Sequence, residues 1–532
     1  MQRRKFLKDG SLVSLGITSL LALTAKADGK TIIPMNGNID LSEVTIDELQ
    51  KRMNEGELTA KQITLWYLQR IQEIDKSGPM LNSVIELNPD AVKISEAMDM
   101  ERSSGRVRGA LHGIPILIKD NIDTADKMMT TAGSLALVGN IATKDAHIVS
   151  LLREAGAVII GKTNLSEFAN FRSTNSTSAW SSRGGQTKMP YALNRNPSGS
   201  SAGTGAAIAA NLCAIGIGTE TDGSIVSPAS VNGLVGIKPT VGLWSRSGII
   251  PISATQDTAG PMCRTVKDAA ILLGALTGID DKDAITKSSK GKAEKDYTKY
   301  CKMDGLKGKR LGVEKSFFEG NSYVVELLKK TVEVLRQQGA IVVEVELLKQ
   351  MNDFSSAEIL VLEYEFKDGL NKYLQSANAN EKTLQQIIAY NKINEEKIMP
   401  YFKQELLEIS DRKGDLNSKE YTEALLKSTS ARKIINDIMQ LNQLDAICGT
   451  TNGLATCIDL VNGDYNTGFS LSSPAACAGY PHITVPMGLI HELPIGFSFF
   501  SKPYEEGKLI SMAYTFEQVT KKRTQPKFLP FI

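Results

Sequence analysis

The feature that most constrains how this chain can fold is a glycine-rich segment at residues 184–248. It holds 12 of the 44 glycines in about an eighth of the length. Glycine adopts backbone conformations that other residues rarely reach, and it leaves room for another group to approach the main chain. The density therefore indicates a backbone that lies close to something it must contact. Within the segment we expect a small-residue helix at Ala202 to Ala214, and a strand from Cys213 to Gly218 that leads to a turn at Ser224.

Strands and helices alternate along the rest of the chain. Apolar runs predict a strand from Ile114 to Ile118 that ends at Lys119, and another at residues 158–160, with a helix at 146–155 between them. Further strands are expected at 310–313, 341–346, 444–448, 483–486 and 496–499, and capping boxes at Thr45 and Thr59 predict two early helices. This alternation predicts an α/β fold in which helices flank one large sheet on both faces.

Three residues in and before the glycine-rich segment have the chemistry of a hydrolytic site: Lys119, Ser200 and Ser224. A serine hydroxyl becomes a good nucleophile only when a base takes its proton and hydrogen-bond donors hold the oxyanion. Glycine-rich backbone can supply the donors, and a buried, neutral lysine can supply the base. None of the four histidines lies in these motifs, so the sequence predicts a serine hydrolase driven by lysine.

The motifs around these residues resemble the amidase signature family, whose hydrolases use a Ser–cis-Ser–Lys triad. They read Ser198-Gly-Ser-Ser-Ala-Gly203, Gly218-Thr-Glu-Thr-Asp-Gly-Ser224 and Ile114-Pro-Ile-Leu-Ile-Lys-Asp-Asn121, with further likeness in Gln256-Asp-Thr-Ala-Gly-Pro261 and at residues 475–488. Matched residue by residue, the resemblance implies that Lys119 is the base, Ser200 the bridging serine and Ser224 the nucleophile. It also implies a cis peptide bond between Gly199 and Ser200, and one sheet of mixed strand order.

From this resemblance we expect an amide hydrolase that forms an acyl-enzyme on Ser224. The backbone N–H groups of Thr221, Asp222, Gly223 and Ser224 would form the oxyanion hole. No metal ion or organic cofactor is needed for this chemistry, and the six cysteines show no zinc-ligand spacing. Cys448 and Cys457 are a conceivable disulfide pair, whereas buried free thiols are expected for most of the six.

Departures from the family pattern bear on the substrate. Glu220 stands where aspartate is usual, Asp222 and Ala202 replace glycines, and Val226 stands where many members have arginine. The strings at 170–174, 183–187 and 220–226 look like the branch that contains bacterial peptide amidases, which remove the C-terminal amide of peptides. The expected substrate is therefore a peptide amide or a related small-molecule amide.

Two other functions remain open from the sequence. One is the A subunit of a tRNA-dependent amidotransferase, against which an export signal argues. The other is a catalytically silent binding protein on an amidase scaffold, which the retained Lys119, Ser200 and Ser224 disfavour. A net charge of +2 argues against a nucleic-acid partner. The oligomeric state cannot be read from the residues.

Residues 1–27 have the pattern of an export signal of the twin-arginine type. Arg3-Arg-Lys-Phe-Leu-Lys8 precedes an apolar run from Leu12 to Leu23 and the small-residue site Ala25-Lys-Ala27. A Sec signal and an uncleaved anchor are the alternatives, although the run is short for a membrane span. We expect an amidase domain at 28–532, exported to the periplasm or outside the cell and without a membrane segment once the signal is removed. Its helix-rich region at about 275–440 is expected to cover the core and shape the substrate cleft.

Two motif matches conflict with the predicted elements. Gly156-Ala-Val-Ile-Ile-Gly-Lys-Thr163 fits the phosphate-loop pattern, but its middle reads as a strand whose N–H groups are already paired. Gly199-Ser-Ser-Ala-Gly203 fits a nucleophile elbow around Ser201, but no strand precedes it. We therefore expect neither a nucleotide site nor a nucleophile at Ser201.

Overall fold

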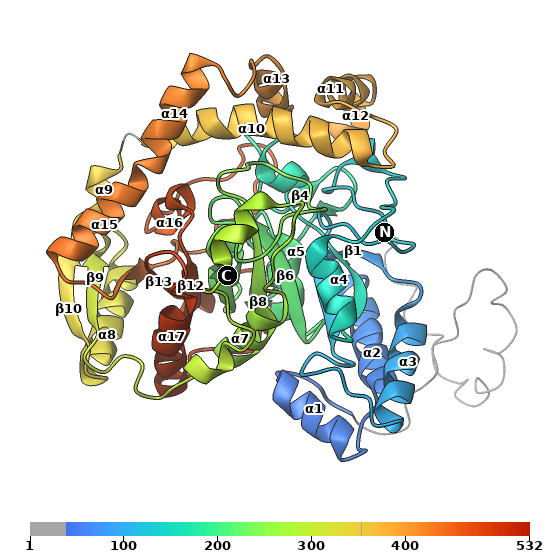
Figure 1. Cartoon of the computed structure of the whole chain (residues 1–532), viewed down its shortest axis with the longest axis horizontal. Helices are drawn as coiled ribbons and strands as arrows, with labels where there is room; N and C mark the ends of the chain where they lie inside the picture. Colours follow the sequence, from blue (N-terminus) through green and yellow to red (C-terminus); the bar gives the residue numbers. More distant parts are fainter. Residues whose placement is uncertain (1–38, 353) are drawn as a thin grey trace, which may run out of the picture. The chain divides into compact units, whose positions relative to one another are not determined.

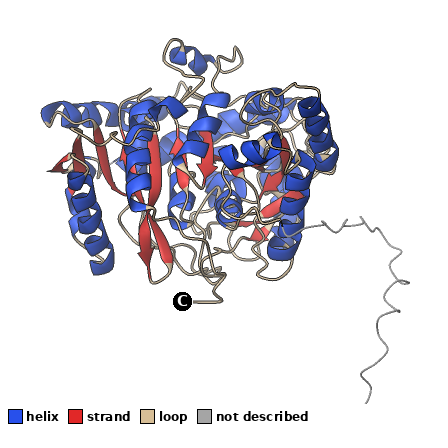
Figure 2. Cartoon of the chain, turned by 90° about the horizontal axis from the view of Figure 1, so that it is seen from below, coloured by secondary structure: helices blue, strands red, loops and turns tan. Residues whose placement is uncertain are grey.

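The computed structural model describes residues 39–352 and 354–532, and within them Asp40–Ile532 form one compact unit. Eleven strands of these residues form a single sheet (Figures 1 and 2). In spatial order they are β1 (Val84–Leu87), β3 (Val158–Thr163), β2 (Pro115–Lys119), β6 (Ile215–Glu220), β8 (Thr258–Cys263), β7 (Val235–Lys238), β12 (His482–Ile490), β13 (Leu493–Phe500), β11 (Ala446–Thr450), β9 (Arg310–Glu314) and β10 (Ile341–Val345). A separate hairpin pairs β4 (Trp180–Ser181) with β5 (Gly185–Gln186).

The sheet is mixed, as the family resemblance implied. Two parallel groups, β3–β2–β6 and β11–β9–β10, lie toward its two ends. The strands between them, and the edge strand β1, pair antiparallel with their neighbours. Helices flank this sheet on both faces (Figure 2). The predicted fold class is confirmed.

Seventeen α-helices lie in the described residues. They are α1 (Ile46–Asn54), α2 (Ala60–Arg70), α3 (Ala91–Ser103), α4 (His147–Glu154), α5 (Ala202–Ala209), α6 (Val226–Val231), α7 (Val266–Ala275), α8 (Ser322–Gln337), α9 (Leu347–Gln350), α10 (Phe354–Ser376), α11 (Leu384–Ile393), α12 (Glu395–Ile398), α13 (Glu405–Asp411), α14 (Lys419–Thr429), α15 (Ala431–Leu441), α16 (Ser472–Ala478) and α17 (Glu506–Thr520). Thr59 forms the full capping box at α2, whereas at α1 Thr45 accepts from the Glu48 N–H without the reciprocal bond.

Sheet order brings the candidate site together. β2 and β6 are parallel neighbours with Ile118 opposite Ile217, so Lys119 at the end of β2 lies beside the last residues of β6. α5 starts directly after the Ser200–Ser201 pair and packs against both strands. An added Cβ on Gly203 would lie 2.3 Å from the Ser83 carbonyl oxygen, so the start of this helix tolerates no side chain there. The segment's glycine content thus follows from close packing.

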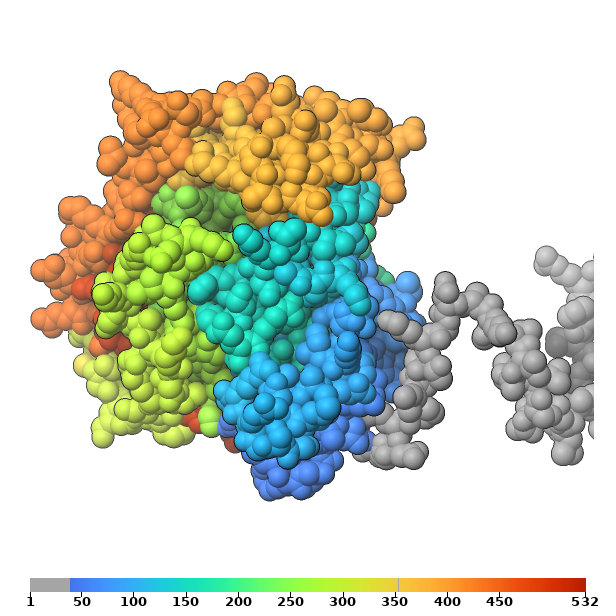
Figure 3. All heavy atoms as spheres, turned by 45° about the vertical axis from the view of Figure 1, so that its right-hand side comes forward, coloured from blue at the N-terminus to red at the C-terminus, as the bar shows by residue number. Residues whose placement is uncertain are grey.

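The helix-rich region packs over this end of the molecule. In Figure 1, α10, α11, α13 and α14 lie together above the sheet, and Figure 3 shows their atoms against those of the chain's first third. The contact is an apolar cluster in which Phe366 and Leu370 of α10 meet Phe168 and Ile250 of the core. Burial of such side chains stabilises the contact by roughly 2 kcal/mol each. The helices are therefore fixed over the carboxyl ends of β2 and β6.

Candidate active site

Lys119 is fully buried at the end of β2. Its Nζ donates to Ser200 Oγ at 2.8 Å, to Thr219 Oγ1 at 2.9 Å and to the Thr219 carbonyl at 3.2 Å. Burial lowers the pKa of Lys119 from 10.5 to about 7, although the more distant carboxylates of Asp257 and Glu220 act in the opposite direction. All three hydrogen-bond partners are uncharged. The site therefore allows a neutral amine near neutral pH.

Asp120, the next residue, faces away from this amine. Its carboxylate accepts hydrogen bonds from Thr131 Oγ1, the Gly133 N–H and the Arg183 guanidinium. Adjacent residues of a strand point to opposite faces of the sheet. The charge that would hold Lys119 protonated is thus engaged elsewhere.

Ser200 lies between Lys119 and the loop that carries Ser224. The Gly199–Ser200 peptide bond is cis, as the resemblance implied. The Ser200 carbonyl accepts from the Ser166 N–H at 3.1 Å, and the N–H of the next residue, Ser201, donates to the Ser224 carbonyl at 3.2 Å. These backbone bonds fix the two serine segments against each other.

Ser224 follows a turn in which Gly223 has a φ of +76°. Just beyond it, the Glu220 carboxylate accepts from the N–H groups of Ile225 at 2.7 Å and Val226 at 2.9 Å. The four N–H groups from Thr221 to Ser224 donate to no acceptor among the described residues. An oxyanion could therefore bind to this loop without displacing an existing hydrogen bond.

The structure does not contain one contact that the bridging role of Ser200 requires. Within the described part of the chain, no hydrogen bond joins the hydroxyl of Ser224 to that of Ser200. Ser224 is 7% exposed to solvent, whereas Ser200 is 1% exposed. Of the two serines, Ser224 is therefore the more accessible to a substrate.

Thr219 and Asn121 belong to the site but were missed from the sequence. Thr219 Oγ1 accepts from Lys119 Nζ and also from Asn121 Nδ2 at 3.0 Å. Both residues lie at the carboxyl ends of parallel neighbouring strands, and polar residues at such ends meet at one edge of a sheet. Predicting their contact from the sequence would have required knowing that β2 pairs with β6, which no local pattern shows.

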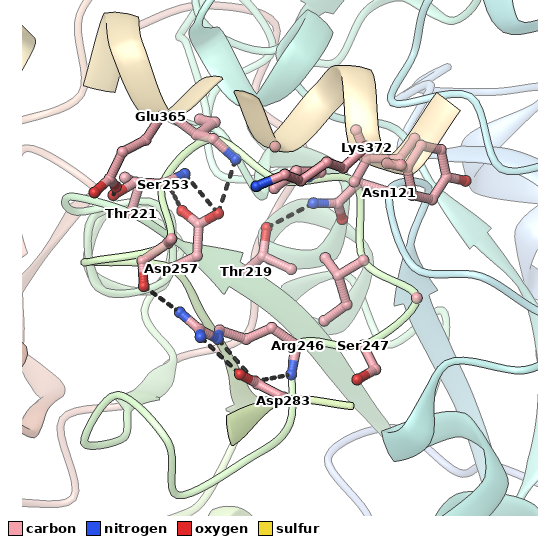
Figure 4. Close-up of a pocket in the computed structure, with 18 of the residues that line it drawn as sticks. Asn121, Thr219, Thr221, Arg246, Ser247, Ser253, Asp257, Asp283, Glu365 and Lys372 are labelled. Carbon is pink, nitrogen blue, oxygen red and sulfur yellow. Dashed lines mark hydrogen bonds and ion pairs between the residues drawn. The ribbon is translucent and has the colours of Figure 1, made fainter. Parts of the chain in front are cut away.

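A cavity of about 420 Å³ adjoins this cluster (Figure 4). Thr219, Thr221 and Asn121 line the cavity together with Lys372 and Glu365 of α10. The helix-rich region therefore contributes to the surface of a cavity beside the site.

Asp257 connects the wall of this cavity to the Ser224 loop. Its carboxylate accepts from Thr221 Oγ1 at 2.6 Å and from the N–H groups of Ile252 and Ser253 at 2.8 Å each. Burial raises the pKa of Asp257 to about 6 despite these donors. The Asp257 carboxylate, which is mostly ionised at neutral pH, thus fixes the loop through its hydrogen bond with Thr221.

Ser201, His482 and the phosphate-loop match, none of which belongs to the predicted triad, make structural contacts. Ser201 Oγ donates to the Thr219 carbonyl at 3.0 Å and accepts from its N–H. His482 is buried beside Ser498, and burial lowers the pKa of His482 to about 3. Residues 158–163 form β3, paired on both sides, so the phosphate-loop match is a strand as expected.

The structure also shows the state of the cysteines and the grouping of possible metal ligands. All six cysteines, each within the described residues, are free, so the conceivable Cys448–Cys457 disulfide is not formed. Among those residues no cluster of three or more histidine, cysteine, aspartate or glutamate side chains is placed to hold a metal ion. A helix long and apolar enough to cross a bilayer is also not found there.

Comparison with known proteins places the chain in a family of amide hydrolases. The family model for amidases matches residues 62–510, and the chain belongs to this amidase signature family. The crystal structure of a peptide amidase from Stenotrophomonas maltophilia is 46% identical with a TM-score of 0.88, covering 92% of this chain and 99% of that one. The chain is therefore an amidase.

Two relatives show how widely the likeness extends. A probable amidase of Arabidopsis thaliana is 40% identical over 520 residues, which is 96% of this chain and 96% of the relative. A glutamyl-tRNA(Gln) amidotransferase subunit of Thermoanaerobacter pseudethanolicus is 33% identical over 92% of this chain and 99% of its own length. The likeness thus extends over more than nine-tenths of the chain, while the two names describe different activities.

Proposed function

We propose that this amidase removes the C-terminal amide of peptides, with Ser224 as nucleophile, Ser200 as proton relay and Lys119 as base. The observation that carries the roles is the 2.8 Å contact between the buried Lys119 amine and Ser200, beside a loop whose four N–H groups have no acceptor among the described residues. The likeness to a peptide amidase at 46% identity supports the substrate. The amidotransferase relative is less similar, at 33%.

In the proposed acylation step, Ser224 Oγ attacks the amide carbonyl carbon and its proton passes to Ser200 Oγ. Ser200 gives its own proton to the neutral Nζ of Lys119. The Ser224–Ser200 hydrogen bond that this transfer needs is made when substrate occupies the site, since catalytic hydrogen bonds often close only in the complex. The tetrahedral oxyanion is held by the N–H groups of the loop.

Collapse of the tetrahedral intermediate completes the exchange. The C–N bond breaks as the proton returns from Lys119 through Ser200 to the leaving nitrogen, so ammonia departs and an ester to Ser224 remains. Water then attacks the ester carbonyl, gives its proton to the same relay, and releases the carboxylic acid and free Ser224. Each half-reaction returns Lys119 to the neutral form.

The proposed substrate is tested by giving the purified protein four candidate compounds: an amidated peptide, a simple aliphatic amide, an aryl amide and free glutamine. We expect ammonia from the amidated peptide, with its internal peptide bonds intact by mass spectrometry. Turnover of only the small or aryl amides would overturn the peptide proposal and leave the amidase family assignment standing. Preferred turnover of glutamine would favour the amidotransferase function.

The roles are tested by covalent labelling with a serine-reactive probe. Ser224→Ala should lose the label and the activity, whereas Ser200→Ala should retain a small part of both because water can bridge the gap. Ser201→Ala is the matched control, since the Ser201 hydroxyl bonds only Thr219. A label that survives Ser224→Ala would show that another residue is the nucleophile.

A further inference from the structure

Two carboxyl groups from distant parts of the chain meet behind the loop that carries Ser224. Asp222 lies in this loop, and Glu358 lies on α10 in the helix-rich region, where it is 6% exposed. The carboxyl group of Glu358 interacts with that of Asp222, and one side-chain amide, that of Gln256, bonds both Glu358 and the Thr221 carbonyl next to Asp222. Two ionised carboxylates buried side by side would repel each other, which favours one proton between them.

Glu358 is also tied to the backbone of the loop. Gln256 Nε2 donates to Glu358 Oε1 at 2.8 Å and to the Thr221 carbonyl at 3.3 Å. A single amide group therefore joins the α10 carboxyl to the peptide that precedes Asp222. Movement of Glu358 would be transmitted directly to the loop.

The contacts of Asp222 leave one oxygen in need of a donor. Asp222 Oδ2 accepts from Ser473 Oγ of α16 at 2.6 Å. Asp222 Oδ1 is buried and accepts no hydrogen bond from a hydroxyl or N–H group of the described residues. A proton held on Glu358 supplies that donor, and it satisfies both carboxyl groups at once.

We propose that Asp222 and Glu358 share one proton, and that this acid pair positions the Thr221–Ser224 loop for catalysis. Glu358 is then a positioning residue that acts through the loop. The proposal rests on the function proposed above, because it assigns the loop's N–H groups to the oxyanion.

The surroundings of the pair favour the protonated form of Glu358. Burial, and after it the Asp222 carboxylate, raises the pKa of Glu358 to about 8. The Cys477 thiol of α16 also interacts with Glu358, and it interacts with Ser428 of α14. The cation Lys238 of β7 interacts with Asp222. Gln256, which donates to Glu358, is neutral.

Loss of the shared proton should lower activity for two reasons. The two carboxylates would repel and displace the loop, and the added negative charge would oppose the developing oxyanion nearby. Activity should therefore fall at alkaline pH as Glu358 ionises, while its rise at lower pH belongs to Lys119. The two limbs have separate causes and can be separated by mutation.

The test measures kcat and kcat/KM against pH for Glu358→Gln, in the full-length protein and with the best amide substrate found. Glutamine keeps the size, accepts from Gln256 and donates an N–H to Asp222 Oδ1, but it cannot ionise. We expect the alkaline limb to disappear while the acid limb stays in place. Glu358→Ala, which leaves Asp222 Oδ1 without a donor, should lower kcat by at least tenfold, and Glu358→Gln should restore most of that loss.

Glu363→Gln is the matched control on the same helix. Glu363 is also buried, but its carboxylate pairs with Lys413 at 3.0 Å. This variant should retain the alkaline limb. An alkaline limb that is absent from the wild type, unchanged in Glu358→Gln, or lost equally in Glu363→Gln would overturn the proposal.

An infrared measurement keeps the pair testable apart from catalysis. The carboxylic acid band of a protonated Glu358 should disappear between about pH 6 and about pH 10 in the wild type. It should be missing from Glu358→Gln, and also from Asp222→Asn at neutral pH, because the introduced side-chain amide would donate to an ionised Glu358. A titrating band that persists in both variants would overturn the shared proton. Failure of the peptide substrate alone would leave this result unaffected.

Discussion

At the scale of single residues, the proposed mechanism depends on a lysine that can lose its proton near neutral pH. Among the described residues, Lys119 has no carboxylate within ion-pair distance, and its hydrogen-bond partners are two hydroxyls and one carbonyl. Burial outweighs the attraction of Asp257 and Glu220 and lowers the pKa of Lys119 to about 7. A proton acceptor with a pKa near the working pH is the most effective general base. The environment of the amine is therefore matched to its proposed role.

This environment predicts the acid limb of the activity profile. Turnover should rise as pH increases through about 7, because the neutral amine is the active form. Lys119→Ala should remove this limb and lower kcat by about 10³-fold, within the range that general-base removal costs. Steady-state kinetics across the pH range checks both points. His482→Ala is the control, and loss of activity there with retention in Lys119→Ala would indicate a histidine-driven hydrolase.

Burial of the same lysine should lower the free energy of unfolding of the protein. A pKa lowered from 10.5 to about 7 means that the folded state disfavours the charged form. The penalty is absent above pH 10.5, grows as pH falls, and is complete below about 7, where it amounts to roughly 4–5 kcal/mol at about 1.36 kcal/mol per pH unit. The hydrogen bonds of the amine offset about half of this.

Lys119→Met should therefore raise the free energy of unfolding by about 2 kcal/mol near neutral pH. The gain should shrink as pH rises and change sign toward pH 10.5, because the wild type then keeps its hydrogen bonds without a charge penalty. Thermal melts of both proteins at several pH values measure this difference. A difference that is independent of pH would contradict a lowered pKa.

At the scale of secondary-structure elements, the sequence located most elements and misjudged where they end. β2, β9, β10 and β12 lie where apolar runs predicted them. α5 ends at Ala209 because Asn211 adopts a left-handed conformation with φ of +59°, whereas the small residues alone suggested a helix to Ala214. β3 continues through Lys162 and Thr163, because both pair with β2 and this pairing outweighs the weak strand propensity of Lys162. Tertiary contacts decided both boundaries.

Gly203 tests how α5 positions Ser200. An added Cβ would lie within 2.3–2.4 Å of the carbonyl oxygens of Ser83 and Asn164, which are backbone atoms and cannot rotate away. Gly203→Ala should therefore destabilise the protein by about 2–3 kcal/mol and lower kcat by displacing Ser200. Melting temperature and kcat measure the two effects. Gly414→Ala is the control, because nothing lies closer than 3.9 Å there, and an equal effect in both variants would dismiss the packing argument.

At the scale of the whole molecule, the site combines a sheet whose motifs stood out in the sequence with a helix-rich region that was predicted to shape the cleft, but without any particular residue. Lys119, Ser200 and Ser224 stood out because glycines and apolar runs surround them. Glu358 gave no signal, since its partner Asp222 lies in a distant segment and a glutamate on a helix is ordinarily exposed. Only the packing of α10 over the sheet brings the two together. Local motifs thus predicted the residues of the proposed chemistry, while the proposed acid pair depends on contacts distant in sequence.

The destination of the molecule is a separate prediction, because residues 1–27 lie outside the described residues. The motif Arg3-Arg4 ahead of the apolar run predicts export by the twin-arginine route. Arginine presents a planar fork of donors that lysine lacks, although both carry one positive charge. A Sec signal needs only positive charge before its apolar run.

Changing Arg3 and Arg4 together to lysine therefore separates the two routes without altering net charge. We expect uncleaved precursor to accumulate in the cytoplasm, as judged by cell fractionation and immunoblotting, while Lys8→Arg leaves export unchanged. Normal export of the double variant would assign the signal to the Sec route, since charge alone would then suffice. Wild-type protein that stays in the membrane fraction at its full length would instead indicate an uncleaved anchor.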